Sequence, residues 1–342
     1  SALCKEIALR KDYISGEPVK TIYFGGGTPS QLSYNDFSRV FEAVNKEFEV
    51  EPDAEITMEA NPDDLSPLYL EPLSKLPFNR ISIGIQSFND GELAFLKRRH
   101  SAAKAKEAVK LCKSFGYNNI SIDLMYGLPN QTMEIWNQNL DEAIALDIQH
   151  ISSYHLIYES GTRLYRLFKS GDVKPVDEDL SVDMFSSMMD RLSTAGFDHY
   201  EISNFAKSGL YSKHNSSYWL GEKYLGLGPA AHSFDGKDRS WNIASTSKYI
   251  EGITTGNPNS EIELLNLNTS YNDFILTGMR TKWGVNLVRL EALFGIKLKT
   301  YCLKNTRKYI DRGFVVLEDN TLRLTRKGIF ISDGIMSDLM YI

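Results

Sequence analysis

The chain alternates short β-branched and aromatic runs with amphipathic stretches, and this alternation constrains its fold most. Six runs have the composition of strands: 21–26, 54–60, 80–87, 119–127, 150–158 and 199–206. Six stretches between them have helical apolar spacing: 34–47, 66–75, 89–97, 101–115, 132–146 and 177–195. Strands joined through helices form right-handed crossovers in a parallel sheet. No GxGxxG fingerprint follows the first strand, so we predict an α/β fold with a partial, TIM-like (β/α) barrel.

The first strand ends in a glycine turn, within the sequence TIYFGGGTPS at residues 21–30. Glycines placed directly after a strand let the backbone approach a ligand that any Cβ would exclude. In barrels of this type the active site lies at the carboxyl ends of the strands. The residues expected there are Gly26, Gly27, Thr28, Glu59, Gln86, Asp123, Ile157 and Tyr158. Acidic and amide groups at successive strand ends predict a pocket for a ligand with amine, carboxylate and ribose groups.

The pattern changes after residue 206, which divides the chain into an expected barrel (1–206) and two further parts. Residues 207–267 are rich in Gly, Ser and aromatic residues, and we expect a loop region that contains the motif HNSSYW. Residues 268–342 predict a small winged-helix-like domain, with two helices before a hairpin that turns at Asp319-Asn320. Its basic residues are expected to form a solvated helix face: Lys297, Lys299, Lys304, Arg307 and Lys308.

Charge and cysteine content narrow the class of protein. The net charge of −6 argues against a general nucleic-acid binder. No apolar run reaches membrane-spanning length, so any contact with a membrane would be peripheral. Cys4, Cys112 and Cys302 are far apart and form neither a metal-ligand spacing nor a disulfide framework. We therefore expect a cytoplasmic protein with reduced thiols.

Five segments together resemble the radical S-adenosylmethionine (SAM) family: YFGGGTPS, EITMEANP, RISIGIQSF, LKRRH and SIDLMYGLPNQT. The resemblance covers essentially the whole chain and lies with the subgroup of heme chaperones and oxygen-independent coproporphyrinogen III oxidases. It implies that the SAM-binding residues are Gly26, Gly27, Thr28, Glu59, Gln86, Arg98, Asp123 and Ile157. The glycine turn would contact the methionine end of SAM, and Ile157 would pack near the adenine. Carboxylates suit an ammonium or ribose hydroxyls, and the Arg98 guanidinium suits a bidentate contact.

One feature of that family is absent from this sequence. The family holds a [4Fe–4S] cluster on a CxxxCxxC loop after the first barrel strand, and no such motif occurs here. The chain opens in a helix expected over residues 2–14, and Cys4 lies downstream of where the loop belongs. We therefore expect the cluster to be bound by a longer parent protein, whose first βα unit is cut off in this chain.

The motif HNSSYW, at residues 214–219, matches the HNxxYW pattern of the heme chaperone branch. The resemblance implies that His214 is a candidate axial ligand of heme iron, and that Asn215 orients its imidazole. Tyr218 and Trp219 would offer aromatic surface to the porphyrin. His232, in the segment KYLGLGPAAHSF, is a second candidate ligand. Of the other histidines, His155 is expected in a pocket wall, while His100, His150 and His199 are expected to be structural.

The resemblance leaves two functions open. The compact N-terminal segment favours a heme chaperone that delivers heme to acceptor hemoproteins such as respiratory enzymes, with SAM and the cluster in a supporting role. The alternative is an enzyme of porphyrin biosynthesis, an oxygen-independent coproporphyrinogen III oxidase that decarboxylates two propionates by a 5′-deoxyadenosyl radical. A phosphate-binding barrel enzyme is disfavoured, because no lysine follows the glycines and Pro29 is the second residue after them.

Overall fold

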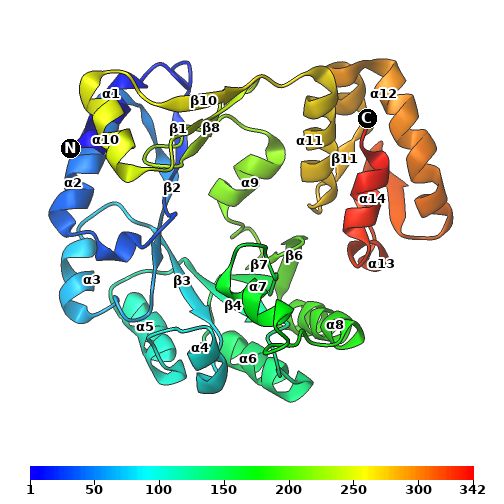
Figure 1. Cartoon of the computed structure of the whole chain (residues 1–342), viewed down its shortest axis with the longest axis horizontal. Coiled ribbons are helices and arrows are strands. Elements are labelled where there is room, and N and C mark those ends of the chain that lie inside the picture. The colour runs from blue at the N-terminus through cyan, green and yellow to red at the C-terminus, as the bar shows by residue number, and fades with distance from the viewer. The chain divides into compact units, whose positions relative to one another are not determined.

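The computed structural model describes the whole chain, Ser1–Ile342, which divides into two compact units. The first unit comprises Ser1–Lys20, Asn35–Ala54 and Lys213–Ile342, and the second comprises Thr21–Tyr34 and Glu55–Ser212. Figure 1 shows the chain coloured from its N-terminus in blue to its C-terminus in red. The expected boundaries after residues 206 and 267 stay predictions.

The main sheet has seven strands in the order β1-β2-β3-β4-β5-β7-β6 (Figure 1). Their bounds are β1 (Val19–Phe24), β2 (Val50–Ala60), β3 (Arg80–Gln86), β4 (Ile120–Tyr126), β5 (His150–His155), β6 (Phe197–Glu201) and β7 (Asn204–Lys207). Strands β2 to β5 pair in parallel with their neighbours in chain order. This is the order that successive right-handed βα units produce, as the sequence predicts.

The last predicted strand is wrong, because residues 199–206 do not form one strand. The chain instead folds into the antiparallel pair β6 and β7, and β7 runs antiparallel to β5. The Glu201 carboxylate explains the reversal, since it accepts hydrogen bonds from the Ser203 backbone N–H and the Asn204 side chain. Strand β5 also ends at His155, so Ile157 and Tyr158 lie beyond it.

The helices between the strands match the sequence-based predictions closely. They are α2 (Tyr34–Glu47), α3 (Pro67–Leu73), α4 (Asp90–Phe95), α5 (Ala102–Ser114), α6 (Met133–Ala145) and α8 (Glu178–Thr194). Five of them begin at a residue whose side chain accepts a hydrogen bond from the first turn: Ser66, Asn89, Ser101, Thr132 and Asp177. Such caps fix where a helix starts. The short α7 (Arg163–Lys169) was not predicted.

The two faces of the sheet differ in polarity. One face carries fully buried isoleucines, among them Ile81, Ile83, Ile120, Ile122 and Ile151. Figure 1 shows α4, α5 and α6 beside this part of the sheet. The other face carries a polar row, in which the paired positions are Glu59 with Ser82, Ser82 with Ser121, and Asp123 with Ser152. Because side chains alternate along a strand, one face forms the core and the other is left for polar chemistry.

Residues 207–267, expected as a loop region, contain regular structure. They hold α9 (Lys213–Leu220), β8 (His232–Phe234), β9 (Arg239–Asn242), α10 (Thr246–Thr255) and β10 (Ser260–Glu263). The three strands form an antiparallel sheet in the order β10-β9-β8. The loop prediction is therefore wrong for these residues. The strands have only three or four residues each and depend on pairing with one another, so no local pattern in this Gly- and Ser-rich segment predicts them.

The N-terminal helix α1 (Ala2–Leu9), shorter than the predicted 2–14, is tied to this small sheet by a buried carboxylate. Glu6 is fully buried. It accepts hydrogen bonds from the Gly228 N–H (2.8 Å), Asn242 Nδ2 (2.6 Å) and Tyr249 Oη (2.5 Å). The Arg10 Nη1 atom lies 3.5 Å from Glu6 Oε1. A buried carboxylate needs such partners, so four segments of the first unit meet at one side chain.

The C-terminal part contains the predicted pair of helices and the hairpin. Its elements are α11 (Leu267–Met279), β11 (Val285–Asn286), α12 (Leu287–Asp311), β12 (Val315–Glu318), β13 (Thr321–Leu324), α13 (Arg326–Ile329) and α14 (Ser332–Leu339). Helix α12 is interrupted at Gly295, where φ is 82° and ψ is 168°. Asp319 and Asn320 both have positive φ, as a tight hairpin turn requires. No helix of the chain is long and apolar enough to cross a membrane.

Candidate functional site

A cavity of about 180 Å³ opens in the second unit where β2, β3 and β4 end. Its lining residues are Gly27, Thr28, Pro29, Ser30, Glu59, Ala60, Asn61, Ser82, Gly84, Gln86, Arg98 and Asp123. Six of these were predicted from the sequence to share one site: Gly27, Thr28, Glu59, Gln86, Arg98 and Asp123. The structure therefore brings together most of the predicted SAM-binding residues, and their role toward SAM stays a prediction.

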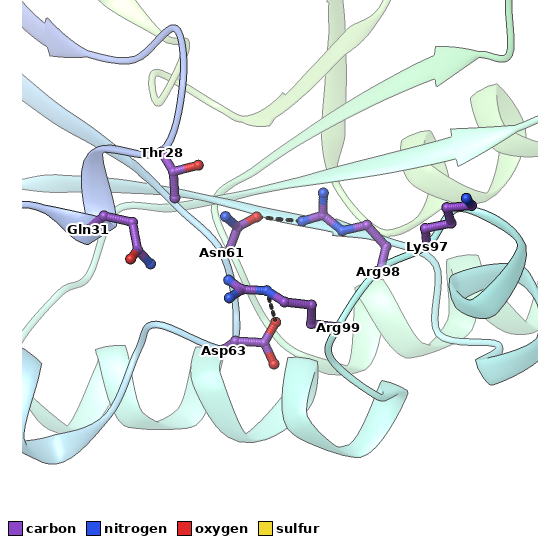
Figure 2. A pocket seen from close by; sticks show the side chains of 7 residues that line it. All are labelled: Thr28, Gln31, Asn61, Asp63, Lys97, Arg98 and Arg99. Carbon is purple, nitrogen blue, oxygen red and sulfur yellow. Dashed lines mark hydrogen bonds and ion pairs between the residues drawn. The ribbon is translucent and has the colours of Figure 1, made fainter. Parts of the chain in front are cut away.

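A second cavity, of about 320 Å³, shares three lining residues with the first: Thr28, Asn61 and Arg98. Its other lining residues are Gln31, Asp63, Lys97 and Arg99. Figure 2 shows Arg98 reaching toward Asn61, while Arg99 reaches toward Asp63. Because the two cavities share residues, they adjoin, and together they are lined by cationic, amide and carboxylate groups.

Glu59 is held in place by β1 and the glycine turn. The Tyr23 hydroxyl donates to its Oε1 at 2.6 Å, and the Gly26 N–H lies 3.3 Å from its Oε2. Burial, and then the charge of Glu59, raise the pKa of Tyr23, so this phenol stays protonated and donates. A Cβ at Gly25 would approach the same carboxylate to 2.8 Å. Gly26 itself therefore reaches the site through its N–H to Glu59, and it does not line either cavity.

Arg98 bridges β2 and β3 at the cavity wall. One of its guanidinium nitrogens donates to Asn61 Oδ1 at 2.6 Å and to the Gly84 carbonyl at 2.8 Å. The preceding residue, Lys97, has a left-handed φ of 55°, which turns the chain after α4. A Cβ at Gly84 would lie 3.4 Å from the same nitrogen and 3.2 Å from Gln86 Nε2. The glycine thus leaves room for both polar side chains.

Asp123 and Glu59 give the cavity a negative wall. Burial, and then the charge of Glu59, raise the pKa of Asp123 to about 6, against a hydrogen bond from Ser152 that lowers it. A positively charged or hydroxyl-bearing ligand would relieve this repulsion. Carboxylates of this kind fit the ammonium and ribose groups of SAM, and the Arg98 guanidinium fits its carboxylate. The residues of the cavity therefore fit SAM by their chemistry.

Three further residues predicted to lie at the pocket, His155, Ile157 and Tyr158, line neither cavity. Ile157 is 76% exposed, and its predicted contact with adenine stays a prediction. His155 lies at the end of β5, where its Nε2 is 2.6 Å from Ser181 Oγ. The buried His150 has its Nδ1 2.7 Å from Ser121 Oγ and its Nε2 2.8 Å from Tyr200 Oη.

Sequence reasoning missed several residues that build the site. Asn61, the partner of Arg98, was read only as part of the motif EITMEANP. Ser30 accepts from the Asn61 N–H at 3.3 Å and donates to Asp64 at 2.7 Å. The Asn-Pro step after β2 and the Pro-Ser step after the glycines were the available signals, because such steps mark turns whose side chains bind nearby backbone.

The cysteines do not form a cluster site. Cys4 is half-buried in α1, while Cys112 and Cys302 are buried. No three His, Cys, Asp or Glu side chains of the structure are grouped so that they could hold a metal ion. Burial also raises the pKa of the Cys112 thiol to about 12, which opposes the thiolate that metals need. The residues present therefore do not fit a [4Fe–4S] cluster.

The HNSSYW motif lies on α9, in the first unit. His214 and Tyr218 are one helical turn apart, and His214 Nε2 is 3.0 Å from Tyr218 Oη. Trp219 lies under the Arg280 guanidinium, 5.2 Å from the ring centroid. Asn215 is half-buried on the same helix. The second candidate ligand, His232, is exposed on β8 with its ring 5.6 Å from that of Trp241.

Comparisons with known proteins give this architecture a family. The radical SAM superfamily matches residues 4–143, and the HemN C-terminal domain matches residues 265–331. The solved structure of coproporphyrinogen III oxidase (HemN) from Escherichia coli aligns with a TM-score of 0.84 and 21% identity, over 99% of this chain and 82% of that one. This likeness confirms the predicted partial barrel with a small C-terminal domain. The chain belongs to the radical SAM family.

Within that family the chain is a HemW-like protein. It is 32% identical to the Heme chaperone HemW of Lactococcus lactis, over 95% of this chain and 85% of the relative. It is also 32% identical to the Heme chaperone HemW of Bacillus subtilis, over 94% of this chain and 86% of the relative. Membership of the family implies SAM and a [4Fe–4S] cluster as its cofactors.

Proposed function

We propose that this protein is a heme chaperone, which binds heme on α9 and delivers it to acceptor hemoproteins such as respiratory enzymes. The observation that carries the proposal is the placement of His214, Tyr218 and Trp219 on a single helix. The two relatives named Heme chaperone HemW, each 32% identical over at least 94% of this chain, support it.

The chemistry of α9 suits a heme. A neutral imidazole is a common axial ligand of heme iron, and aromatic rings pack on the porphyrin face. His214 is half-buried and Tyr218 is 38% exposed, so a ligand can reach both. Two arginines lie at the C-terminal end of the helix, where Arg289 donates to the Leu220 carbonyl at 3.3 Å and Arg280 covers Trp219. Guanidinium groups suit the propionate carboxylates of a heme.

The SAM-binding residues belong to the same proposal. Glu59 and Asp123 would hold the ammonium and ribose groups, Arg98 the carboxylate, and the turn at Gly26, Gly27 and Thr28 the methionine end. In this family SAM supplies radical chemistry when a reduced cluster is bound beside it. The chain's own contribution is to orient SAM through the Tyr23–Glu59 and Arg98–Asn61 hydrogen bonds.

The oxidase alternative has less support. It rests on the likeness to HemN, which at 21% identity shows the fold alone. The relatives that support the chaperone proposal are 32% identical to this chain, and both are named as heme chaperones.

A hemin titration followed at the Soret band tests the chaperone proposal. His214→Ala is expected to weaken hemin binding at least about tenfold, which is the loss of one metal–ligand or strong polar contact. His232→Ala tests the second candidate ligand: His232 lies on another element, β8, so its replacement should leave the affinity within about twofold of the wild type when His214 holds the iron. Equal binding by the wild type and His214→Ala would place the ligand elsewhere and overturn the assignment of α9.

A further inference from the structure

The nitrogen of His214 that would bind iron already has a partner in the heme-free protein. Its Nε2 lies 3.0 Å from Tyr218 Oη, within hydrogen-bond distance. The two rings are edge-on, with centroids 5.0 Å apart and an interplanar angle of 88°. The hydroxyl and the nitrogen are therefore close enough for the phenol to donate a hydrogen bond to the lone pair of an unprotonated Nε2.

The phenol is held in this position from its other side. The Tyr218 ring packs edge-on against Tyr224, with centroids 4.6 Å apart, and Tyr224 in turn lies 6.3 Å from Phe234. A phenol is protonated at neutral pH, so the Tyr218 hydroxyl can donate a hydrogen bond to Nε2. An imidazole that accepts at Nε2 carries its own proton on Nδ1.

We propose that Tyr218 is a removable cap on the iron-binding nitrogen of His214, and that heme capture requires its hydroxyl to leave Nε2. This inference rests on the proposed function. Iron and the phenol proton compete for one lone pair, so the cap lowers the fraction of binding-competent histidine and hence the apparent affinity. The same competition favours release, since the returning hydroxyl replaces the iron contact. Tyr218 is thus a positioning residue that makes heme binding reversible, as transfer to an acceptor demands.

Removal of the hydroxyl alone tests the cap. Tyr218→Phe keeps the aromatic ring but removes the hydroxyl that faces Nε2, and it is expected to bind hemin about three- to tenfold more tightly, with faster association and slower release. Tyr224→Phe is the matched control, because it removes the hydroxyl of the ring that packs on Tyr218 and leaves the Tyr218 hydroxyl in place, and its affinity should stay within about twofold of the wild type. Stopped-flow mixing with hemin gives both rates.

The outcomes separate this inference from the proposed function. Loss of binding in His214→Ala with unchanged or weaker binding in Tyr218→Phe overturns the cap and leaves the chaperone proposal standing. Wild-type binding in His214→Ala overturns both.

A measurement on the heme-free protein does not depend on heme at all. In ¹⁵N-histidine spectra the Nε2 resonance of His214 should move in Tyr218→Phe and stay in place in Tyr224→Phe. An unchanged Nε2 resonance in Tyr218→Phe would mean that no hydrogen bond exists to be broken, which also overturns the cap.

Discussion

At the scale of single residues, the cavity of the second unit depends on two glycines that leave room for other side chains and on one residue with a left-handed backbone conformation. Gly25 and Gly84 leave space that Glu59, Gln86 and Arg98 fill. Gln86 itself has a φ of 72°, at the irregular end of the β3–β4 pairing. A non-glycine residue in this region costs about 1 kcal/mol or more, so the surrounding contacts hold it there.

Arg98→Lys should weaken the binding of SAM about tenfold or more, because an ammonium that donates to Asn61 and Gly84 has one donor left and cannot make a bidentate contact with a carboxylate. Arg99→Lys is the control from the next position. Arg99 is an exposed side chain paired with Asp63 and Asp64, so its replacement should change SAM affinity less than about threefold. Calorimetric titration of each variant with SAM measures the difference. Wild-type affinity in Arg98→Lys would show that only the positive charge matters, and an equal loss in both variants would show that the geometry of Arg98 is not special; either result contradicts this account.

The raised pKa of Asp123 makes a prediction for stability. Its value of about 6 in the folded protein is above the ordinary 3.8, so the folded state binds this proton more tightly than the unfolded chain does. The stability that this group contributes is therefore present at low pH and falls as the pH rises from about 4 to about 6. Asp123→Asn should raise the free energy of unfolding by about 1 kcal/mol at pH 7.5 and by much less at pH 4.5. Urea unfolding at the two pH values tests this, and an equal gain at both would contradict it.

At the scale of elements, a helix or strand can be predicted well from the sequence when residues within that segment determine its structure. Helices α5, α6 and α8 have an N-cap and regular apolar spacing, and their observed bounds lie within one residue of the prediction. The β6–β7 turn depends instead on one carboxylate, Glu201, folding back on Asn204. Strands β8 to β10 have three or four residues each and exist only through their pairing. Neither the β6–β7 turn nor these short strands has a local sequence pattern from which it could be predicted.

The break in α12 is an element-scale feature with a clear test. Gly295 has φ 82° and ψ 168°, and an added Cβ would meet nothing within 4 Å. Any loss in Gly295→Ala is therefore a backbone effect, which we expect to lower the free energy of unfolding by about 1–3 kcal/mol. Gly334→Ala, inside α14 and equally free of contacts, should instead be stabilising by about 0.5–1 kcal/mol. Thermal unfolding of both variants compares the signs, and two changes of the same sign would contradict this account.

At the scale of the whole molecule, contacts between residues far apart in the sequence decide what local patterns cannot. Five of the eight predicted strand-end residues line one cavity, because parallel strands place their ends at the same edge of the sheet: Gly27, Thr28, Glu59, Gln86 and Asp123. Asn61 and Gly84 were missed because their roles exist only once Arg98 reaches them from a later segment. Glu6 is a similar case in the first unit, since its partners Gly228, Asn242 and Tyr249 follow it by more than 220 residues.

Glu6→Gln should lower the free energy of unfolding by about 2 kcal/mol, because hydrogen bonds to a buried charged acceptor are lost and an amide donor meets the donor Asn242. The matched control is Glu17→Gln. Glu17 makes one surface ion pair, with Lys223, and its replacement should cost less than about 1 kcal/mol. Denaturant unfolding followed by circular dichroism measures both changes. A loss in Glu6→Gln no larger than that in Glu17→Gln would mean that the buried cluster contributes nothing to stability.

The position of Trp219 on α9 gives the protein a built-in optical reporter. Its indole lies five residues after His214 on the same short helix, under Arg280. A porphyrin held at His214 would absorb the light that this indole emits, so excitation energy would pass from tryptophan to heme. Heme arrival and departure would then appear as a fall and a recovery of intrinsic emission, and transfer to an acceptor hemoprotein could be followed without labelling either partner.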